Sequence, residues 1–290
     1  MNSSVARPQR IAQAFAQACR EELDAPKPGN VHVFADGHRM TAADFERSAE
    51  AAAGPLAAAG ARVGKRILGA VEATDAAVGA NTNLGIILLC APLAAAAETQ
   101  SQDFRSSLAC VLRALDVEDA ALAFRAIVRA SPGGLGRAET HDVFAPATVS
   151  LRDAMAEAAD RDRIALQYVT GFADVFELGE PLLATALAAS PDRRLATLAT
   201  YLGFLAAFPD SHILRKHGAV TAERIRLAAS TLQARTQAAG RLDDILPELL
   251  SWDAELKQAG INPGTSADLT VATLFAHRLR GILPPTPNSD

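Results

Sequence analysis

The sequence predicts an all-α protein, a single-domain bundle of many helices. Along almost the whole chain, apolar residues recur at intervals of three and four, which is the spacing of one helix face. No segment alternates apolar and polar residues over the length of a strand. Many of the apolar residues are alanines, which have the highest helix propensity. We therefore expect helices from one end of the chain to the other.

In the first half of the chain, the first predicted helix ends before Pro26. Its inner face is the stripe Ile11, Phe15 and Cys19. The second helix begins at Thr41, which forms a capping-box pattern with Asp44, and runs to about Gly60. Apolar stripes predict four more helices, over residues 63–78, 85–97, 108–115 and 122–128.

In the second half, residues that favour helix starts mark three further helices. Ser190 and Pro191 predict a start, because proline is tolerated in a first turn, and this apolar helix ends near Pro209. Thr221 is predicted to cap a long alanine-rich helix that ends at Gly240, and Ser266 to open the last helix.

Only one segment suggests a boundary between domains, the glycine-rich loop at residues 131–137. The chain contains no repeat of fixed period and no long linker. A single domain over residues 1–290 is the simpler interpretation.

The composition excludes several classes of protein. The chain has 290 residues, of which 49% are hydrophobic and 21% charged, so it is long and apolar enough for a sizeable core. Its net charge of −5 and its aromatic content of 5% leave no basic face and few base-stacking platforms. We therefore expect no nucleic-acid partner.

We expect a cytoplasmic protein without a membrane anchor. The first ten residues contain no apolar run with a cleavage site, and the most apolar segment, residues 84–97, is too short to span a bilayer. Cys19, Cys90 and Cys110 lie in apolar stretches without a metal or redox motif, which predicts buried free thiols in a reducing compartment. Homo-oligomerisation is left open.

Polar residues cluster in four segments where helices stop: residues 27–32, 79–85, 209–218 and 262–269. Each segment has a structural explanation, because Pro-Gly turns and Ser, Thr, Asn or Asp caps are common at helix ends. The segment 79–85 exceeds that need, since a single cap would not require three polar side chains between two glycines. Unpaired backbone N–H groups at the start of the helix that follows would suit an anion.

No common catalytic or nucleotide-binding motif is present. The sequence lacks a P-loop, a G-x-G-x-x-G fingerprint and a G-x-S-x-G elbow. Its six histidines do not show zinc-site spacing. A nucleotide would therefore bind outside the usual α/β frameworks.

Taken in order, five segments resemble the triphosphoribosyl-dephospho-CoA synthase family over nearly the whole chain. Residues 27–31 (KPGNV) are similar to the family's K-P-G-x-V turn, and residues 38–45 to its H-x-D-M…F stretch with one residue fewer. Residues 81–85 (NTNLG) resemble N-T-H-K-G, and residues 210–216 resemble D-T-N…R. Residues 262–269 (NPGTSADL) resemble the terminal S-P-G-G-S-A-D-L.

The resemblance implies an all-helical transferase that moves a triphosphoribosyl group from ATP to a ribose hydroxyl of dephospho-CoA and releases adenine. Such chemistry needs cations or helix N-termini for the triphosphate, carboxylates near the sugar carbon, and a base for the hydroxyl. The helix-end loops would form one polar cleft. In it, Asp210 and Asp268 would bind Mg²⁺, stabilise the ring cation or take the hydroxyl proton, and Lys27 and Lys216 would hold phosphates. The implied substrate-binding set is Lys27, Gly29, Asn30, His32, His38, Asn81, Thr82, Asn83, Gly85, His212, Lys216 and Ser266.

Departures from the family pattern leave two alternatives. Asn83 and Leu84 stand where the family has His and Lys, Arg39 stands in place of an acid, and the family's Y-G…G-A-R-G-E-A segment has no clear counterpart. Loss of a lysine from a triphosphate site removes a contact of roughly 1.5–3 kcal/mol. A divergent member could instead use phosphoribosyl pyrophosphate with another acceptor, such as a pterin-type one-carbon carrier intermediate. A non-catalytic nucleotide-binding protein is the second alternative.

Overall fold

The computed structural model describes residues 6–99, 103–133, 136 and 140–283. These residues form helices and loops, and no strand occurs among them. The only strand-like features described are two isolated bridges in the loop after the first helix, between His32 and Ala35 and between Gly37 and Met40. The predicted all-α class is confirmed.

The helices follow one another with short connections. In the first half they are α1 (Arg7–Asp24), α2 (Ala42–Leu56), α3 (Val63–Val78), α4 (Leu84–Ala97), α5 (Phe104–Ala114) and α6 (Val117–Ala130). In the second half they are α7 (Leu151–Ala156), α8 (Arg163–Thr170), the π-helix η1 (Asp174–Gly179), α9 (Glu180–Ala189), α10 (Arg193–Ala207), α11 (Ser211–Ala238), the 3₁₀-helix η2 (Leu242–Asp244), α12 (Leu246–Gln258) and α13 (Gly264–Arg280).

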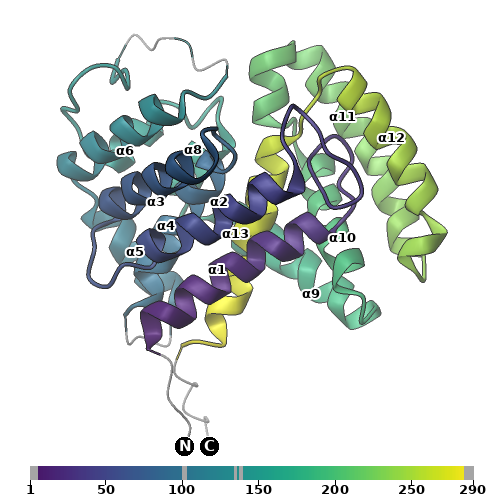
Figure 1. Ribbon diagram of the computed structural model, residues 1–290, viewed down its shortest axis with the longest axis horizontal. Coiled ribbons are helices and arrows are strands. Elements are labelled where there is room, and N and C mark those ends of the chain that lie inside the picture. The colour runs from purple at the N-terminus through teal and green to yellow at the C-terminus, as the bar shows by residue number, and fades with distance from the viewer. Residues whose placement is uncertain (1–5, 100–102, 134–135, 137–139, 284–290) are drawn as a thin grey trace, which may run out of the picture.

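The N-terminal and C-terminal helices, α1 and α13, lie side by side in the middle of the molecule (Figure 1). Helices α2 to α6 and α8 lie on one side of this pair, and α9 to α12 lie on the other. Helix α13 contacts α1, α4, α8, α9, α10 and α11, as well as η1. The last helix in the sequence therefore joins the two sides.

Two clusters of buried apolar side chains correspond to these sides. The larger is built mainly from α1 to α8 and α13, and the smaller from α10, α11 and α12. Helix α4 is buried on nearly all faces, as its uninterrupted apolar sequence requires. Pro92 inside it has no N–H for the Leu88 carbonyl, and the Tyr168 hydroxyl donates to that carbonyl instead, at 2.7 Å.

Helix boundaries agree with the sequence where an apolar stripe defines the helix. The capping box of Thr41 and Asp44 is confirmed, although α2 ends at Leu56 and not near Gly60. Three predicted starts are wrong, because another residue supplies the cap or the break. Asp192 caps α10 in place of Ser190, the chain breaks at Gly218 rather than at Thr221, and α13 begins at Gly264.

The remaining predictions about organisation have mixed outcomes. Cys19 and Cys90 are buried free thiols, but Cys110 is exposed, because it lies on the solvent side of α5. In the described residues no helix combines the length and apolar character that spanning a bilayer requires. Residues 134–135 and 137 of the glycine-rich loop lie outside the described residues. The single domain over residues 1–290 stays a prediction.

Candidate active site

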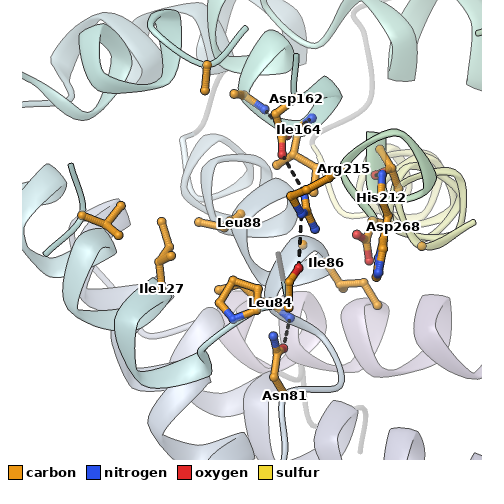
Figure 2. Close-up of a pocket in the computed structure, with 18 of the residues that line it drawn as sticks. Asn81, Leu84, Ile86, Leu88, Ile127, Asp162, Ile164, His212, Arg215 and Asp268 are labelled. Carbon is orange, nitrogen blue, oxygen red and sulfur yellow. Dashed lines mark hydrogen bonds and ion pairs between the residues drawn. The ribbon is translucent and has the colours of Figure 1, made fainter. Parts of the chain in front are cut away.

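A cavity of about 620 Å³ opens where the ends of several helices meet (Figure 2). Its walls come from α1, α2, α4, α6, α7, α8, α11 and α13 and from the loops that follow α1, α3, α6, α7 and α12. The four polar segments singled out in the sequence all contribute at least one residue to this lining. Segments as far apart in the chain as residues 30 and 268 therefore converge on one polar cleft.

The predicted site residues divide into two groups. One group lines the cavity: Asn30, His38, Asn81, Thr82, Gly85, His212, Lys216 and Asp268. The other group does not line it: Lys27, Gly29, His32, Asn83, Asp210 and Ser266. Members of the second group are buried in contacts that position the first.

Asp210 holds the first turns of α11 and α13 together. It is fully buried, and one carboxylate oxygen accepts from the backbone N–H groups of His212 and Ile213 at the start of α11. The other oxygen accepts from the N–H and the hydroxyl of Ser266 in α13, both at 2.8 Å. Any role of Asp210 in metal binding or proton transfer would require these bonds to break. The junction orients His212 and, two residues after Ser266, Asp268 toward the cavity.

Lys27 is also fully buried, and its ammonium group binds the protein itself. It donates to the carbonyl oxygens of Glu22 at 2.6 Å and Val31 at 2.9 Å, and it forms an ion pair with the Glu22 carboxylate at 3.2 Å. The ammonium therefore faces the end of α1 rather than the cleft, which differs from the predicted phosphate contact. Glu22 does line the cavity.

Contacts with α12 and with the loop before α13 fix the turn that follows Lys27. Gly29 has a φ of +82°, its N–H donates to Asp253 of α12, and a Cβ there would lie 2.8 Å from Pro263. Asn30 donates from its amide to Asn262, so the turn reaches the loop before α13. His32 is buried behind the turn, 3.4 Å from Asp253.

His38 reaches the cavity from a tight turn. His38 and Arg39 both have positive φ angles, 55° and 64°, between paired Gly37 and Met40, as in a type I′ turn. The conformation is unfavourable for residues other than glycine. A ring nitrogen of His38 lies 2.8 Å from the Gly29 carbonyl oxygen, which ties this turn to the first one.

The start of α4 brings the segment 81–85 against Asp268. The Asn81 side chain accepts from the Leu84 N–H, and the Thr82 hydroxyl donates to Ser48 of α2. Gly85 packs so closely on Asp268 that a Cβ at position 85 would lie 2.0 Å from a carboxylate oxygen. Glycine at this position is what allows Asp268 to occupy the cavity wall.

The environment changes the pKa values of several lining groups. Burial, together with the carboxylates of Asp210 and Glu22, raises the pKa of Asp268 well above its usual range. Burial also raises the pKa of Glu22, an effect that the Lys27 ammonium opposes. Burial and the nearby Lys216 lower the pKa of His212 to about 3, so its imidazole is neutral at pH 7.

The cavity has an apolar side and a polar side. Figure 2 shows Ile127 and Leu88 on one side, with His212 and Asp268 on the other and Arg215 between them. Further apolar lining comes from Phe124 of α6 and from α7, where Leu151 and Met155 are buried. Such an arrangement can hold a flat apolar group at one end and an anionic group at the other.

The predicted site set omitted several polar residues of the lining, namely Glu22, Arg161, Asp162 and Arg215, although Arg215 lies in the polar segment 209–218. Asp162 caps α8 through the N–H groups of Ile164 and Ala165, and its second oxygen lies 3.5 Å from Arg215. Glu22 had a signal in the sequence, because position 22 continues the stripe formed by positions 11, 15 and 19. A charged residue at a core position is unusual and indicates a special partner.

A resident metal centre finds no support in the described residues, where no three His, Cys, Asp or Glu side chains form a group that could hold an ion. Asp210 and Asp268 do not act as the predicted pair of equivalent carboxylates. The oxygens of Asp210 already accept four hydrogen bonds. Around Asp268 no hydrogen bond from a described residue reaches the carboxylate, which leaves it open toward the cavity.

Comparison with known proteins gives the family. The sequence model of the CitG family, described as ATP:dephospho-CoA triphosphoribosyl transferase, matches residues 8–286. The chain belongs to this family. The predicted resemblance and the predicted transferase class are confirmed, and neither alternative is favoured.

A solved structure supports the same assignment. The crystal structure of a candidate triphosphoribosyl-dephospho-CoA synthase from Archaeoglobus fulgidus resembles this CitG-family chain with a TM-score of 0.64 and 26% sequence identity. The match covers 81% of this chain and 98% of that one. No match was found among curated proteins.

Proposed function

We propose that this protein transfers the triphosphoribosyl group of ATP to a ribose hydroxyl of dephospho-CoA and releases adenine. Membership of the CitG family over residues 8–286 is the observation that carries the proposal. In this reaction the bond between C1′ and N9 of ATP breaks, and a bond forms between C1′ and the acceptor oxygen. The acceptor loses a proton, and adenine leaves with one.

The two sides of the cavity suit the two ends of ATP. The apolar side chains of α4, α6 and α7 can enclose the adenine ring, which is flat and weakly polar. Cationic groups on the polar side, Arg215 and Lys216 of α11 and Arg161, can contact the triphosphate. The start of α4, where Asn83 makes no side-chain cap hydrogen bond, adds partial positive charge near Gly85.

We place the sugar beside Asp268, on the polar side of the cavity. Asp268 faces the cavity without a hydrogen-bond partner among the described residues, and such a group can stabilise positive charge that develops on the ribose ring. Burial raises the pKa of Asp268 and so disfavours its ionised form, whereas positive charge on the ring would lower that pKa again.

We treat Mg²⁺ as part of the nucleotide substrate, MgATP. Magnesium in nucleotide sites keeps several waters and binds mainly phosphate oxygens, so a dedicated cluster of protein ligands is not required. The cytoplasmic location and the oligomeric state stay predictions.

The test is a direct assay of products. Purified protein is incubated with MgATP and dephospho-CoA, and adenine and the coupled product are measured by chromatography and mass spectrometry. We expect adenine in a 1:1 ratio to dephospho-CoA consumed, and a product heavier by one triphosphoribosyl group. Controls omit the acceptor or replace ATP with phosphoribosyl pyrophosphate. Turnover with phosphoribosyl pyrophosphate and none with ATP would refute the proposal.

A further inference from the structure

Glu22 is the charged residue of the cavity wall whose presence the fold explains least. It lies in the last turn of α1 on the apolar inner face of that helix, and its exposed fraction is 3%. A glutamate is almost never buried to this extent unless it is paired. Glu22 nevertheless lines the cavity, at the end of a helix that packs against α13.

The partner of Glu22 is Lys27, whose other contacts among the described residues are with backbone carbonyls. The Lys27 ammonium lies 3.2 Å from a Glu22 carboxylate oxygen, and its hydrogen bonds go to the carbonyl oxygens of Glu22, Val31 and Ala25. The hydrogen bonds to the three carbonyl oxygens alone match the three protons of the ammonium group, so Lys27 has none left for a phosphate. Burying such a pair costs solvation energy, and replacement by apolar residues is often neutral or stabilising. Stability alone therefore does not explain why this Glu22–Lys27 ion pair is buried.

We propose that Glu22 is the catalytic base that takes the proton of the acceptor hydroxyl, and that Lys27 is a positioning residue whose ion pair holds the Glu22 carboxylate in place. This inference rests on the proposed function, because the hydroxyl belongs to the proposed acceptor. The O–H bond of the acceptor breaks as its oxygen attacks C1′ of ATP, and the proton moves to the Glu22 carboxylate. Glu22 then returns the proton to solvent, and adenine takes one from solvent, so the enzyme ends as it began.

Asp268 is the other carboxyl group of the same wall, and its surroundings differ. Among the described residues no cation forms an ion pair with Asp268, whereas Glu22 touches Lys27. Two carboxyl groups in environments this different are typical of sites that divide the acid and base roles between them. Burial raises the pKa of Glu22, but the Lys27 ammonium opposes this rise and favours the ionised form that a base requires.

Several titratable groups face Glu22 from the elements packed around it. Lys27 follows on the loop, Cys19 lies one turn earlier in α1, Tyr201 comes from α10 and Asp268 from α13. Burial raises the pKa values of the Cys19 thiol and the Tyr201 hydroxyl, so both are neutral near pH 7. The raised pKa of Glu22 brings the carboxylate closer to the working pH, where a general base is most effective.

Behind Lys27 lies a second group of charges. Lys257 and Asp253 of α12 form an ion pair at 2.9 Å, and His32 lies against Asp253. Burial lowers the pKa of Lys27; the Glu22 carboxylate opposes this, the Lys257 charge adds to it and the Asp253 charge opposes it. None of these three residues lines the cavity, so we expect them to affect Glu22 mainly through Lys27.

The test compares pH profiles of adenine release by Glu22→Gln, Lys27→Met and a matched control, Glu21→Gln. Glu21 is the neighbouring buried glutamate, but it pairs with Arg193 and Arg278 away from the cavity. We expect Glu22→Gln to lower kcat by about 10²–10⁴-fold and to abolish the ascending limb of kcat/KM against pH. Glu21→Gln should lower Tm and leave the pH profile unchanged.

Lys27→Met separates positioning from catalysis. Without the cation, the pKa of Glu22 rises further, so the ascending limb should move to higher pH and activity should recover at alkaline pH. A purely structural lysine would lower activity equally at every pH. If Glu22→Gln does not fold, Glu22→Asp replaces it: the limb should persist while kcat falls, because the carboxylate is displaced.

The outcomes separate this inference from the proposed function. Adenine release by the wild-type protein, with Glu22→Gln within tenfold of its kcat and the same ascending limb, overturns the role of Glu22 and leaves the proposed function standing. A folded Glu22→Asp with wild-type kcat also overturns it. An unmoved limb in Lys27→Met overturns the role of Lys27. A wild-type protein that releases no adenine overturns the proposed function, and the inference with it.

Discussion

Asp210 at the junction of α11 and α13 and Glu22 at the end of α1 are both buried carboxyl groups, yet they are partnered in different ways. The two oxygens of Asp210 accept four hydrogen bonds, three of them from backbone N–H groups at helix starts. Among the described residues, Glu22 forms an ion pair with Lys27, and its side chain lines the cavity. The two carboxyl groups are buried to a similar extent, but they differ in whether their oxygens are available to a ligand.

The difference shows how a buried acid can be assigned a role. A carboxylate offers about four lone-pair sites, and Asp210 has filled them with groups of its own protein. It therefore fixes two helices relative to each other. A carboxylate such as Glu22 or Asp268, which retains an oxygen facing a cavity, is available to a substrate. The same residue type thus builds the site in one place and acts in it in another.

The largest expected effect is on stability, at the junction. Asp210→Ala leaves several buried donors without partners, and we expect the free energy of unfolding to fall by about 3 kcal/mol or more. The control is Asp192→Ala, an N-cap at the exposed start of α10, which should cost about 1 kcal/mol. Urea unfolding measures both. If Asp210→Ala costs no more than the control and still abolishes adenine release, Asp210 belongs to the chemistry, as the sequence predicted.

The second prediction concerns activity, at the contact between α4 and α13. A methyl group at position 85 would lie 2.0 Å from an Asp268 oxygen, so Gly85→Ala must displace that carboxylate. Misplacement of a site residue by about 1 Å costs roughly 10²-fold in rate, and we expect that loss in adenine release.

The matched control for Gly85 is Gly54→Ala in α2, where a methyl group would meet nothing within 4 Å. It should add up to about 1 kcal/mol of stability through helix propensity and leave activity unchanged. A Gly85→Ala protein as active as Gly54→Ala would show that Asp268 does not need its observed position.

Much of the fold was predictable because helices leave a regular pattern. The stripes and the Thr41 capping box located most helices of the first half to within a few residues. Errors arose where one polar residue had to be chosen as a cap from several neighbours. Ser190, Thr221 and Ser266 all have suitable side chains, and which residue caps a helix depends on backbone angles that the sequence does not show.

The sequence predicted which segments form the site, but it did not predict the role of each residue in them. Asp210 and Asp268 look equivalent in the sequence, since each lies close to a helix start. Asp210 precedes its helix and caps it, whereas Asp268 is the fifth residue of α13 and reaches the cavity. Lys27 turns inward because the chain reverses at Pro28 and Gly29, a direction that no local pattern encodes.

The smallest expected effect is a pH dependence at His212, which belongs to the junction through its N–H and to the cavity through its ring. The pKa of His212 is lowered to about 3 in the folded protein, and an unfolded histidine has a value near 6.5. Between these values the unfolded chain binds a proton that the folded protein does not. Stability contributed by neutral His212 is therefore lost as the pH falls below about 6.5.

His212→Asn removes this dependence, because asparagine does not titrate. Between about pH 7.5 and about pH 5.5, we expect the wild-type free energy of unfolding to fall by about 1 kcal/mol more than that of the variant. Acids with raised pKa values, such as Asp268, act in the opposite direction, but they are present in both proteins and cancel in the difference. Equal slopes in the two proteins would mean that the ring of His212 gains a proton in the folded state, and that the cavity is better hydrated than its buried carboxyl groups indicate.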